Sequence, residues 1–182
     1  QAMNQGLIPS RYAKALFEYA SEHGCDKPVF ERMQTLAGAF ASEPALVRAV
    51  SNPYVSRHDK IQLLTTASGS NENDMAMSRF LDLLADNNRL DMARDIALAY
   101  LKIYRTEHNI RLVTVTSAAP MAEAEESRLK QLIQRHLGSA TMEYNHQVNP
   151  DLIGGFQVSI DNEKLDASVA NELKQLRLKL LN

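Results

Sequence analysis

The stretch IRLVTVTSA, residues 110–118, decides the fold because the spacing of hydrophobic residues changes there. From residue 7 to about residue 108, apolar side chains recur every three or four residues, which is typical of amphipathic helices. In residues 110–118, Val and Thr are abundant and apolar side chains alternate with polar ones, which is typical of a β-strand. The sequence therefore predicts an α+β protein whose first part is helical and whose second part contains a sheet.

The first part is predicted to form a compact six-helix bundle with short links. Its first helix begins near Pro9 or Ser10 and stops at Gly24, because glycine commonly follows the last residue of a helix. Ser56 and Asp59 have the spacing of a capping box ahead of the fourth helix. The six helices are expected over residues 9–24, 26–40, 44–52, 60–68, 74–88 and 89–109.

The second part is predicted to follow the order strand, helix, strand, strand, helix. The acidic side chains of Glu123, Glu125 and Glu126 favour the start of a helix that runs to about Leu137. Residues 140–148 alternate again as a second strand, and a glycine-containing third strand follows. Asp166 can cap a final helix over residues 167–182. We thus expect two domains, a helical bundle over residues 1–106 and a small C-terminal α/β domain over residues 107–182.

The charge balance argues against binding to nucleic acid. The chain has 20 Lys and Arg against 22 Asp and Glu, a net charge of -2, whereas nucleic-acid-binding surfaces carry excess positive charge. A single cysteine rules out an intrachain disulfide and favours a reducing compartment. No apolar segment approaches the roughly 18 residues that span a bilayer, so direct bilayer insertion is not expected.

The pair Gly154 and Gly155 raises the question of whether residues 149–168, NPDLIGGFQVSIDNEKLDAS, contain a phosphate-binding loop. Such a loop needs spaced glycines, normally at the start of a helix. Here the two glycines are adjacent, and the residues from Phe156 onward alternate as a strand. We interpret the glycines as a β-bulge or a close backbone approach. The strand is expected to pair with residues 141–148, and no ligand is expected at the glycines.

No catalytic or metal-binding pattern is evident in the sequence. The five histidines are scattered, without a second ligand at the spacing that a metal requires. Cys25 lies beside a helix junction and has no nucleophile signature around it. No carboxylate stands alone inside an apolar run, where its pKa would be raised for acid catalysis. We therefore predict no catalytic residue, cofactor or metal.

Two predicted helices carry more apolar surface than a surface helix needs. At about 100° per residue, the apolar side chains of residues 12–20 cover about 200° of arc, and those of residues 76–84 cover about 160°. A surface helix commonly needs a stripe of only about 100°. Either both helices are central in the bundle, or part of this surface forms a groove for the amphipathic helix of a partner.

Four stretches, in this order and spacing, resemble the delta subunit of bacterial F-type ATP synthases, whose family includes the mitochondrial oligomycin-sensitivity-conferring protein. Each is mostly apolar pattern and turn chemistry, and the four together are specific. The resemblance extends from about residue 7 to residue 181, and the absence of a transit peptide favours the bacterial form. The stretches are RYAKALFEYA (11–20), NPYVSRHDKIQLL (52–64), FLDLLADNNRLD (80–91) and NPDLIGGFQVSIDNEKLDAS (149–168).

The resemblance implies a non-catalytic stator subunit of a proton-translocating ATP synthase. In that family, the helical domain holds the amino-terminal helix of an alpha subunit in a groove between its first and fifth helices. The C-terminal domain binds the end of the b-subunit stalk, so the implied location is peripheral, at the cytoplasmic face of the bacterial plasma membrane. The residues expected to form the groove are Tyr12, Ala15, Leu16, Met77, Phe80, Leu81 and Leu84.

Two other classes of function remain open from the residues alone. An RNA-associated helical module of the antitermination type has a similar bundle, but it would need a basic stripe, and it would show a salt-sensitive RNA shift. A small enzyme that uses the glycine pair for a nucleotide would be stabilised against heat by that nucleotide.

Overall fold

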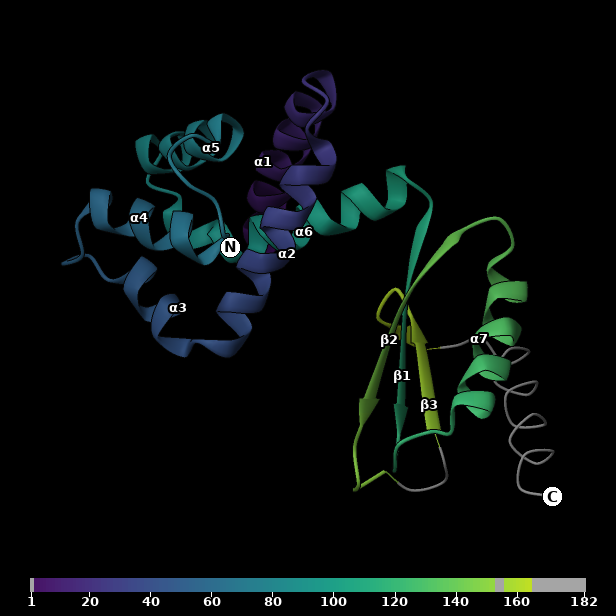
Figure 1. Ribbon diagram of the computed structural model, residues 1–182. Coiled ribbons are helices and arrows are strands. Elements are labelled where there is room, and N and C mark those ends of the chain that lie inside the picture. Colours follow the sequence, from purple (N-terminus) through teal and green to yellow (C-terminus); the bar gives the residue numbers. More distant parts are fainter. Residues whose placement is uncertain (1, 153–155, 165–182) are drawn as a thin grey trace. The chain divides into compact units, whose positions relative to one another are not determined.

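The computed structural model describes residues 2–152 and 156–164 (Figure 1). The chain divides into two compact units, residues 1–104 and 105–182. The first unit contains helices α1–α5 and most of α6, and the second contains the end of α6 and a mixed sheet with helix α7. The predicted α+β class is therefore confirmed. The predictions for Gly154, Gly155 and the final helix over residues 167–182 lie outside the described residues.

Local signals in the sequence set most of the helix ends in the first unit. Ser56 Oγ accepts a hydrogen bond from Asp59 N at 3.1 Å, which caps α4 as expected. Gly24 has φ +66°, the left-handed conformation that glycine adopts most easily. The bounds are α1 Ala2–Glu22, α2 Asp26–Ser42, α3 Pro44–Ser51, α4 Arg57–Ala67, α5 Met75–Asp86, the 3₁₀ turn η1 Leu90–Met92 and α6 Ala93–Glu107.

The predicted start of α1 near Pro9 or Ser10 is wrong, because the helix begins at Ala2 and contains Pro9. An internal proline removes one backbone hydrogen bond and crowds the carbonyl four residues earlier. Pro9 is itself buried, and Ser10 Oγ donates to Gly6 O at 3.0 Å. Packing of the proline ring offsets its cost, so the residue does not end the helix.

Tyr100 lies at the centre of the first unit. Its side chain is 0% exposed, and its hydroxyl donates to Asp26 O at 2.8 Å. The ring of Phe17 meets it edge to face, with centroids 5.9 Å apart. Burial, together with the nearby Asp26 carboxylate, raises the pKa of the Tyr100 phenol above its ordinary value.

The raised pKa of Tyr100 predicts a loss of stability in alkali. Above about pH 10 the unfolded chain releases the phenolic proton, whereas the buried phenol keeps it, so the free energy of unfolding should fall as pH rises. Tyr100→Phe should cost about 1 kcal/mol near neutral pH, because Asp26 O loses its donor. The difference between the two proteins should then shrink above about pH 10. Urea unfolding of both proteins from neutral pH to above about pH 10 measures this difference in the free energy of unfolding. A difference that stays constant with pH would show that Tyr100 does not cause the loss of stability.

Asn88 lies in the turn after α5 with φ +55°. This left-handed conformation is strained for residues with a Cβ, although asparagine tolerates it better than most. We expect Asn88→Gly to raise the free energy of unfolding by about 0.5–1 kcal/mol and with it the melting temperature. Asn88→Val should lower the melting temperature. Scanning calorimetry distinguishes the two variants, and equal melting temperatures would show that the turn is unstrained.

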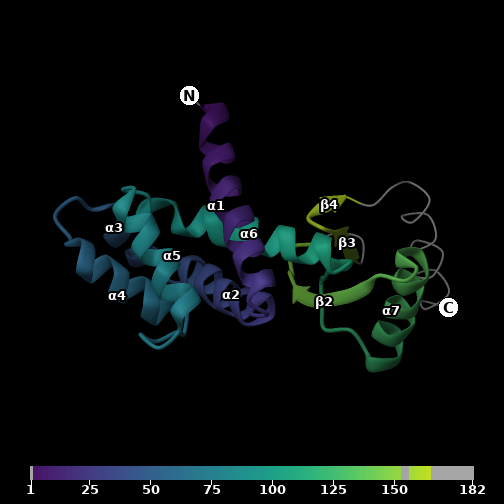
Figure 2. The same ribbon diagram turned by 90° about the horizontal axis from the view of Figure 1, so that it is seen from above.

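The second unit is a small mixed sheet with α7 Glu123–Leu137 packed on one face (Figures 1 and 2). The buried side chains of the sheet point to the side that α7 covers, where they meet Leu129 and Ile133. Val113, Val115 and Val158 alternate with polar side chains along their strands, so they fall on one face of the sheet. The strands are β1 Ile110–Ser117, β2 Thr141–Val148, β3 Phe156–Ile160 and β4 Glu163–Lys164, in the spatial order β2-β1-β3-β4.

The expectation that the glycine-containing strand pairs with residues 141–148 is wrong. β3 pairs antiparallel with β1, with Val158 opposite Val115, and β2 pairs parallel with the other edge of β1. The chain crosses over through α7 and places β2 beside one edge of β1. β3 lies beside the other edge of β1, where Val158 faces the core beneath α7. In this position β3 lies between β1 and β4, and Val158 is only 9% exposed.

Strand β4 was not predicted. It follows β3 through Asp161 and Asn162, and Ile160 pairs with Glu163. Both turn residues have positive φ, 55° and 65°. Positive φ at both positions is the geometry of a type I′ hairpin, which Asp and Asn favour. The Asp-Asn pair was therefore an available signal for this turn.

Candidate partner-binding groove

A pocket of about 160 Å³ lies between α1 and α5. Each helix contributes residues spaced three or four apart, so two straight rows of side chains form its walls. Ala15 and Ala76 are small, and they keep the space between the rows open. The lining residues are Tyr12, Ala15, Leu16, Tyr19, Ala76, Arg79, Phe80 and Leu83.

The structure separates the residues expected at the groove into two sets. Tyr12, Ala15, Leu16 and Phe80 line the pocket. Met77, Leu81 and Leu84 are 1%, 0% and 0% exposed, and they lie in the core of the first unit. Phe156, the residue that follows the glycine pair, begins β3 and packs against the core of the second unit.

Four lining residues were not among those expected, namely Tyr19, Ala76, Arg79 and Leu83. A signal for two of them was present, because Tyr19 follows Tyr12 by seven residues and Leu83 follows Phe80 by three. Leu83 is 47% exposed, whereas Phe80, about one turn earlier in the same row, is 5% exposed. Among the large apolar side chains that line the pocket, Leu83 is therefore the most accessible to a partner.

Two hydrogen bonds connect α1 and α5 at opposite ends of the groove. Asn87 Nδ2 donates to the Tyr12 hydroxyl at 3.0 Å, and Arg79 Nη1 donates to the Tyr19 hydroxyl at 3.3 Å. Because Tyr12 meets the end of α5 and Tyr19 meets its start, the two helices run antiparallel. The hydrogen bonds hold the two walls at a defined separation.

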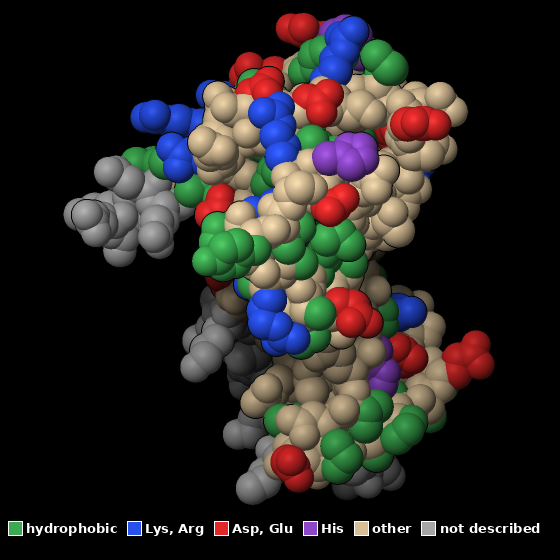
Figure 3. Space-filling model, turned by 90° about the vertical axis from the view of Figure 1, so that its left-hand side faces the viewer, with side chains coloured by type: hydrophobic (Ala, Val, Ile, Leu, Met, Phe, Trp, Pro, Cys, Tyr) green, Lys and Arg blue, Asp and Glu red, His purple; other side chains and the backbone are tan. Residues whose placement is uncertain are grey.

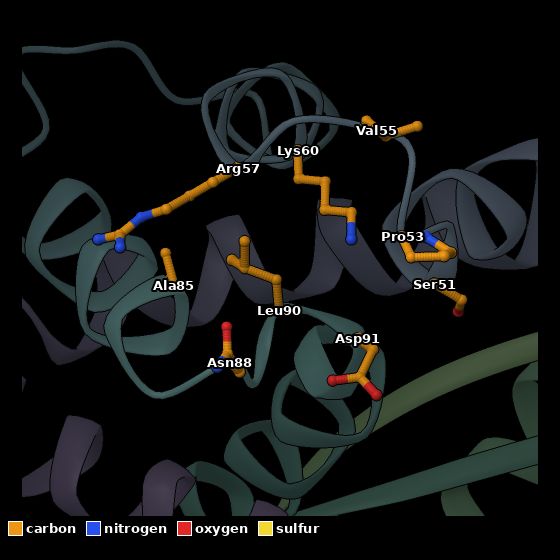
Figure 4. A pocket seen from close by; sticks show the side chains of 9 residues that line it. All are labelled: Ser51, Pro53, Val55, Arg57, Lys60, Ala85, Asn88, Leu90 and Asp91. Atoms are coloured by element: carbon orange, nitrogen blue, oxygen red, sulfur yellow. The ribbon is translucent and has the colours of Figure 1, made fainter.

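A second hollow, of about 390 Å³, lies between α3, α4 and the turn after α5 (Figure 4). Lys60 extends from α4 toward its interior, and Asp91 lies on the opposite side. Arg57 instead forms an ion pair with Asp86. Charges of both signs and few apolar walls make this hollow less suited to an apolar helix than the groove.

Ser117, His146 and Glu126 meet at the edge of the second unit, which the sequence did not predict. Ser117 Oγ donates to Ala119 O at 2.6 Å, so His146 Nε2 is the donor in its 2.6 Å hydrogen bond to Ser117 Oγ. His146 Nδ1 lies 3.9 Å from Glu126 Oε1. Because the serine proton is held by a carbonyl and the residue is 5% exposed, the cluster stabilises the end of β1 and offers no nucleophile.

Other kinds of site find little support in the described residues. Across residues 2–152 and 156–164, no cluster of three or more His, Cys, Asp or Glu side chains could hold a metal ion. In the same part of the chain, no helix is both long enough and apolar enough to cross a membrane. On the face shown in Figure 3, basic and acidic side chains are interspersed.

Comparison with known proteins decides the family. The model of the ATP synthase delta (OSCP) subunit family matches residues 8–180. The chain belongs to this family. It is 38% identical to ATP synthase subunit delta of Parabacteroides distasonis, covering 98% of each chain. It is 33% identical to that of Bacteroides thetaiotaomicron, covering 99% of this chain and 97% of the relative.

A solved structure of an ATP synthase contains a chain with a similar fold. A chain of the Toxoplasma gondii mitochondrial ATP synthase hexamer is similar to this one with a TM-score of 0.65 and 26% identity, over 96% of this chain and 98% of that one. The resemblance seen in the four sequence stretches is thereby confirmed. Family membership makes the chain a subunit of the F-type ATP synthase, and the family is a structural one, which is consistent with a non-catalytic role.

Proposed function

We propose that this delta-family subunit is a stator component that links the catalytic head of the ATP synthase to its peripheral stalk. The groove between α1 and α5 is proposed to hold the amino-terminal helix of an alpha subunit. The observation that supports this is the pair of facing rows, which present an exposed leucine, two alanines and further apolar side chains, with Arg79 as the charged member.

The dimensions of the groove suit a helix. From Tyr12 to Tyr19 the α1 row extends about two turns, or roughly 10 Å. An amphipathic helix would place apolar residues at positions i, i+3 or i+4, and i+7 between the rows. The alanines on both walls let the backbone of such a helix approach closely.

The second unit is proposed to bind the end of the b-subunit stalk, as the family resemblance implies. Torque on the rotor would otherwise turn the catalytic head, so the head must be tied to the membrane sector by two attachments in series. The subunit would then lie peripherally, at the cytoplasmic face of the bacterial plasma membrane. This role requires slow dissociation from both partners, and it requires no bond chemistry.

Calorimetric titration tests the proposed function. The full chain is titrated with a synthetic peptide of roughly 20 residues from the amino terminus of the alpha subunit of the same organism. We expect one peptide per chain, a negative heat-capacity change from buried apolar surface, and most of the affinity retained at about 0.5 M salt. Absence of binding would overturn the alpha-subunit assignment. For the stalk, a pull-down with the carboxy-terminal segment of the b subunit should recover the chain.

A further inference from the structure

Arg79 places a positive charge at one end of the groove without a carboxylate to balance it. Its guanidinium donates to the Tyr19 hydroxyl at 3.3 Å, and the side chain is exposed. Within the described part of the chain, Arg79 forms no ion pair with any Asp or Glu. This includes Asp82, which lies about one turn further along α5. Four other arginines do have carboxylate partners, namely Arg32, Arg57, Arg105 and Arg111.

The Tyr19 hydroxyl uses one donor of the guanidinium and orients the rest. Arginine has five N–H donors in a planar fork, and two parallel donors match the oxygens of a carboxylate. Tyr19 is itself held by His23, whose ring stacks on it with centroids 4.1 Å apart. Arg79 is thus held at the groove with donors to spare.

We propose that the occupant of the groove carries a carboxylate beside its apolar stripe and that Arg79 binds this carboxylate. This inference rests on the proposed function and names the chemistry of the partner helix. The opposite end of the groove carries the neutral amide of Asn87. Of the residues that line the pocket, Arg79 alone is charged, so the two directions of an inserted helix are unequal and Arg79 also selects the orientation of the helix.

Charge reversal at Arg79 tests the inference. With the alpha-subunit peptide as probe, Arg79→Glu should weaken binding roughly tenfold, and Arg79→Gln less, because reversal adds repulsion to the lost attraction. The deficit of Arg79→Glu should shrink at about 0.5 M salt, since screening acts on exposed pairs. Arg94→Glu, an equal charge change at an exposed position of α6, should bind as the original chain does.

A compensating change identifies the carboxylate itself. Each Asp and Glu of the peptide is replaced by Lys in turn. One of these peptides should bind the original chain more weakly and bind Arg79→Glu more tightly than the unmodified peptide does. Circular dichroism of Arg79→Glu and Arg79→Gln verifies that both variants fold.

Four outcomes would overturn the inference, and they are distinguishable. If Arg79→Glu binds normally while Leu83→Asp loses binding, the groove stands and the carboxylate is wrong. If both variants bind normally, the peptide binds elsewhere on the chain, and the groove is wrong as its site; if the original chain does not bind the peptide, the proposed function fails. If sedimentation shows a dimer that Leu83→Asp abolishes, the occupant is a second copy of this chain.

Discussion

Replacing Leu83 by aspartate should weaken binding of the alpha-subunit peptide by at least about 30-fold, or ~2 kcal/mol. The side chain is 47% exposed in the free chain, so the charge is solvated there and the fold tolerates it. In the complex the carboxylate would be buried against apolar side chains without a partner, which is costly. Calorimetric titration measures the affinity, and circular dichroism verifies that the fold is unchanged.

Leu98→Asp is the matched control for this prediction. Leu98 is 45% exposed, lies on α6 and is not a lining residue of the groove. This variant introduces the same charge at a leucine of nearly equal exposure. It should bind the peptide with unchanged affinity. Equal weakening by the two variants would show that the effect is one of net charge, and normal binding by Leu83→Asp would remove Leu83 from the site.

Leu84→Ala should lower the free energy of unfolding of the helical unit by about 2–5 kcal/mol, although its neighbour Leu83 faces the groove. Leu84 is 0% exposed, so truncation leaves a cavity in a packed core. Leu83→Ala should change stability by less than about 0.5 kcal/mol, since much of the side chain already lies in water.

Urea unfolding followed by helical circular dichroism compares the two alanine variants. Under conditions where the Leu84→Ala chain is folded, we expect it to bind the alpha-subunit peptide with nearly unchanged affinity, because its side chain lies behind the groove wall. A stability loss in Leu83→Ala equal to that in Leu84→Ala would contradict this separation of core and groove.

The local elements were predictable from the sequence because their signals are local. The Ser56 cap of α4 and the glycine at position 24 act on the residues beside them. The start of α1 was not predictable in this way, since the tolerance of the helix for Pro9 depends on burial of the ring by the rest of the unit. An internal proline is usually a sufficient reason to end a helix.

The candidate groove was predictable at the level of helices but not of residues. A wide apolar arc shows that a helix has more than one apolar neighbour, and it does not show which neighbour covers which part. Met77 and Leu81 lie on the arc of α5 together with Phe80, yet these two are core residues and Phe80 lines the pocket. Packing of α5 against the rest of the unit decides the division.

The α+β class, most of the helices, the first three strands and the family follow from the sequence alone. These depend on periodicity and capping within a few residues, or on the order of stretches along the chain. The tertiary structure decided that β3 pairs with β1, that Met77, Leu81 and Leu84 are core residues, and that Arg79 and Leu83 line the groove. Those features depend on contacts between segments far apart in the chain, and no local pattern specifies which distant segment supplies a contact.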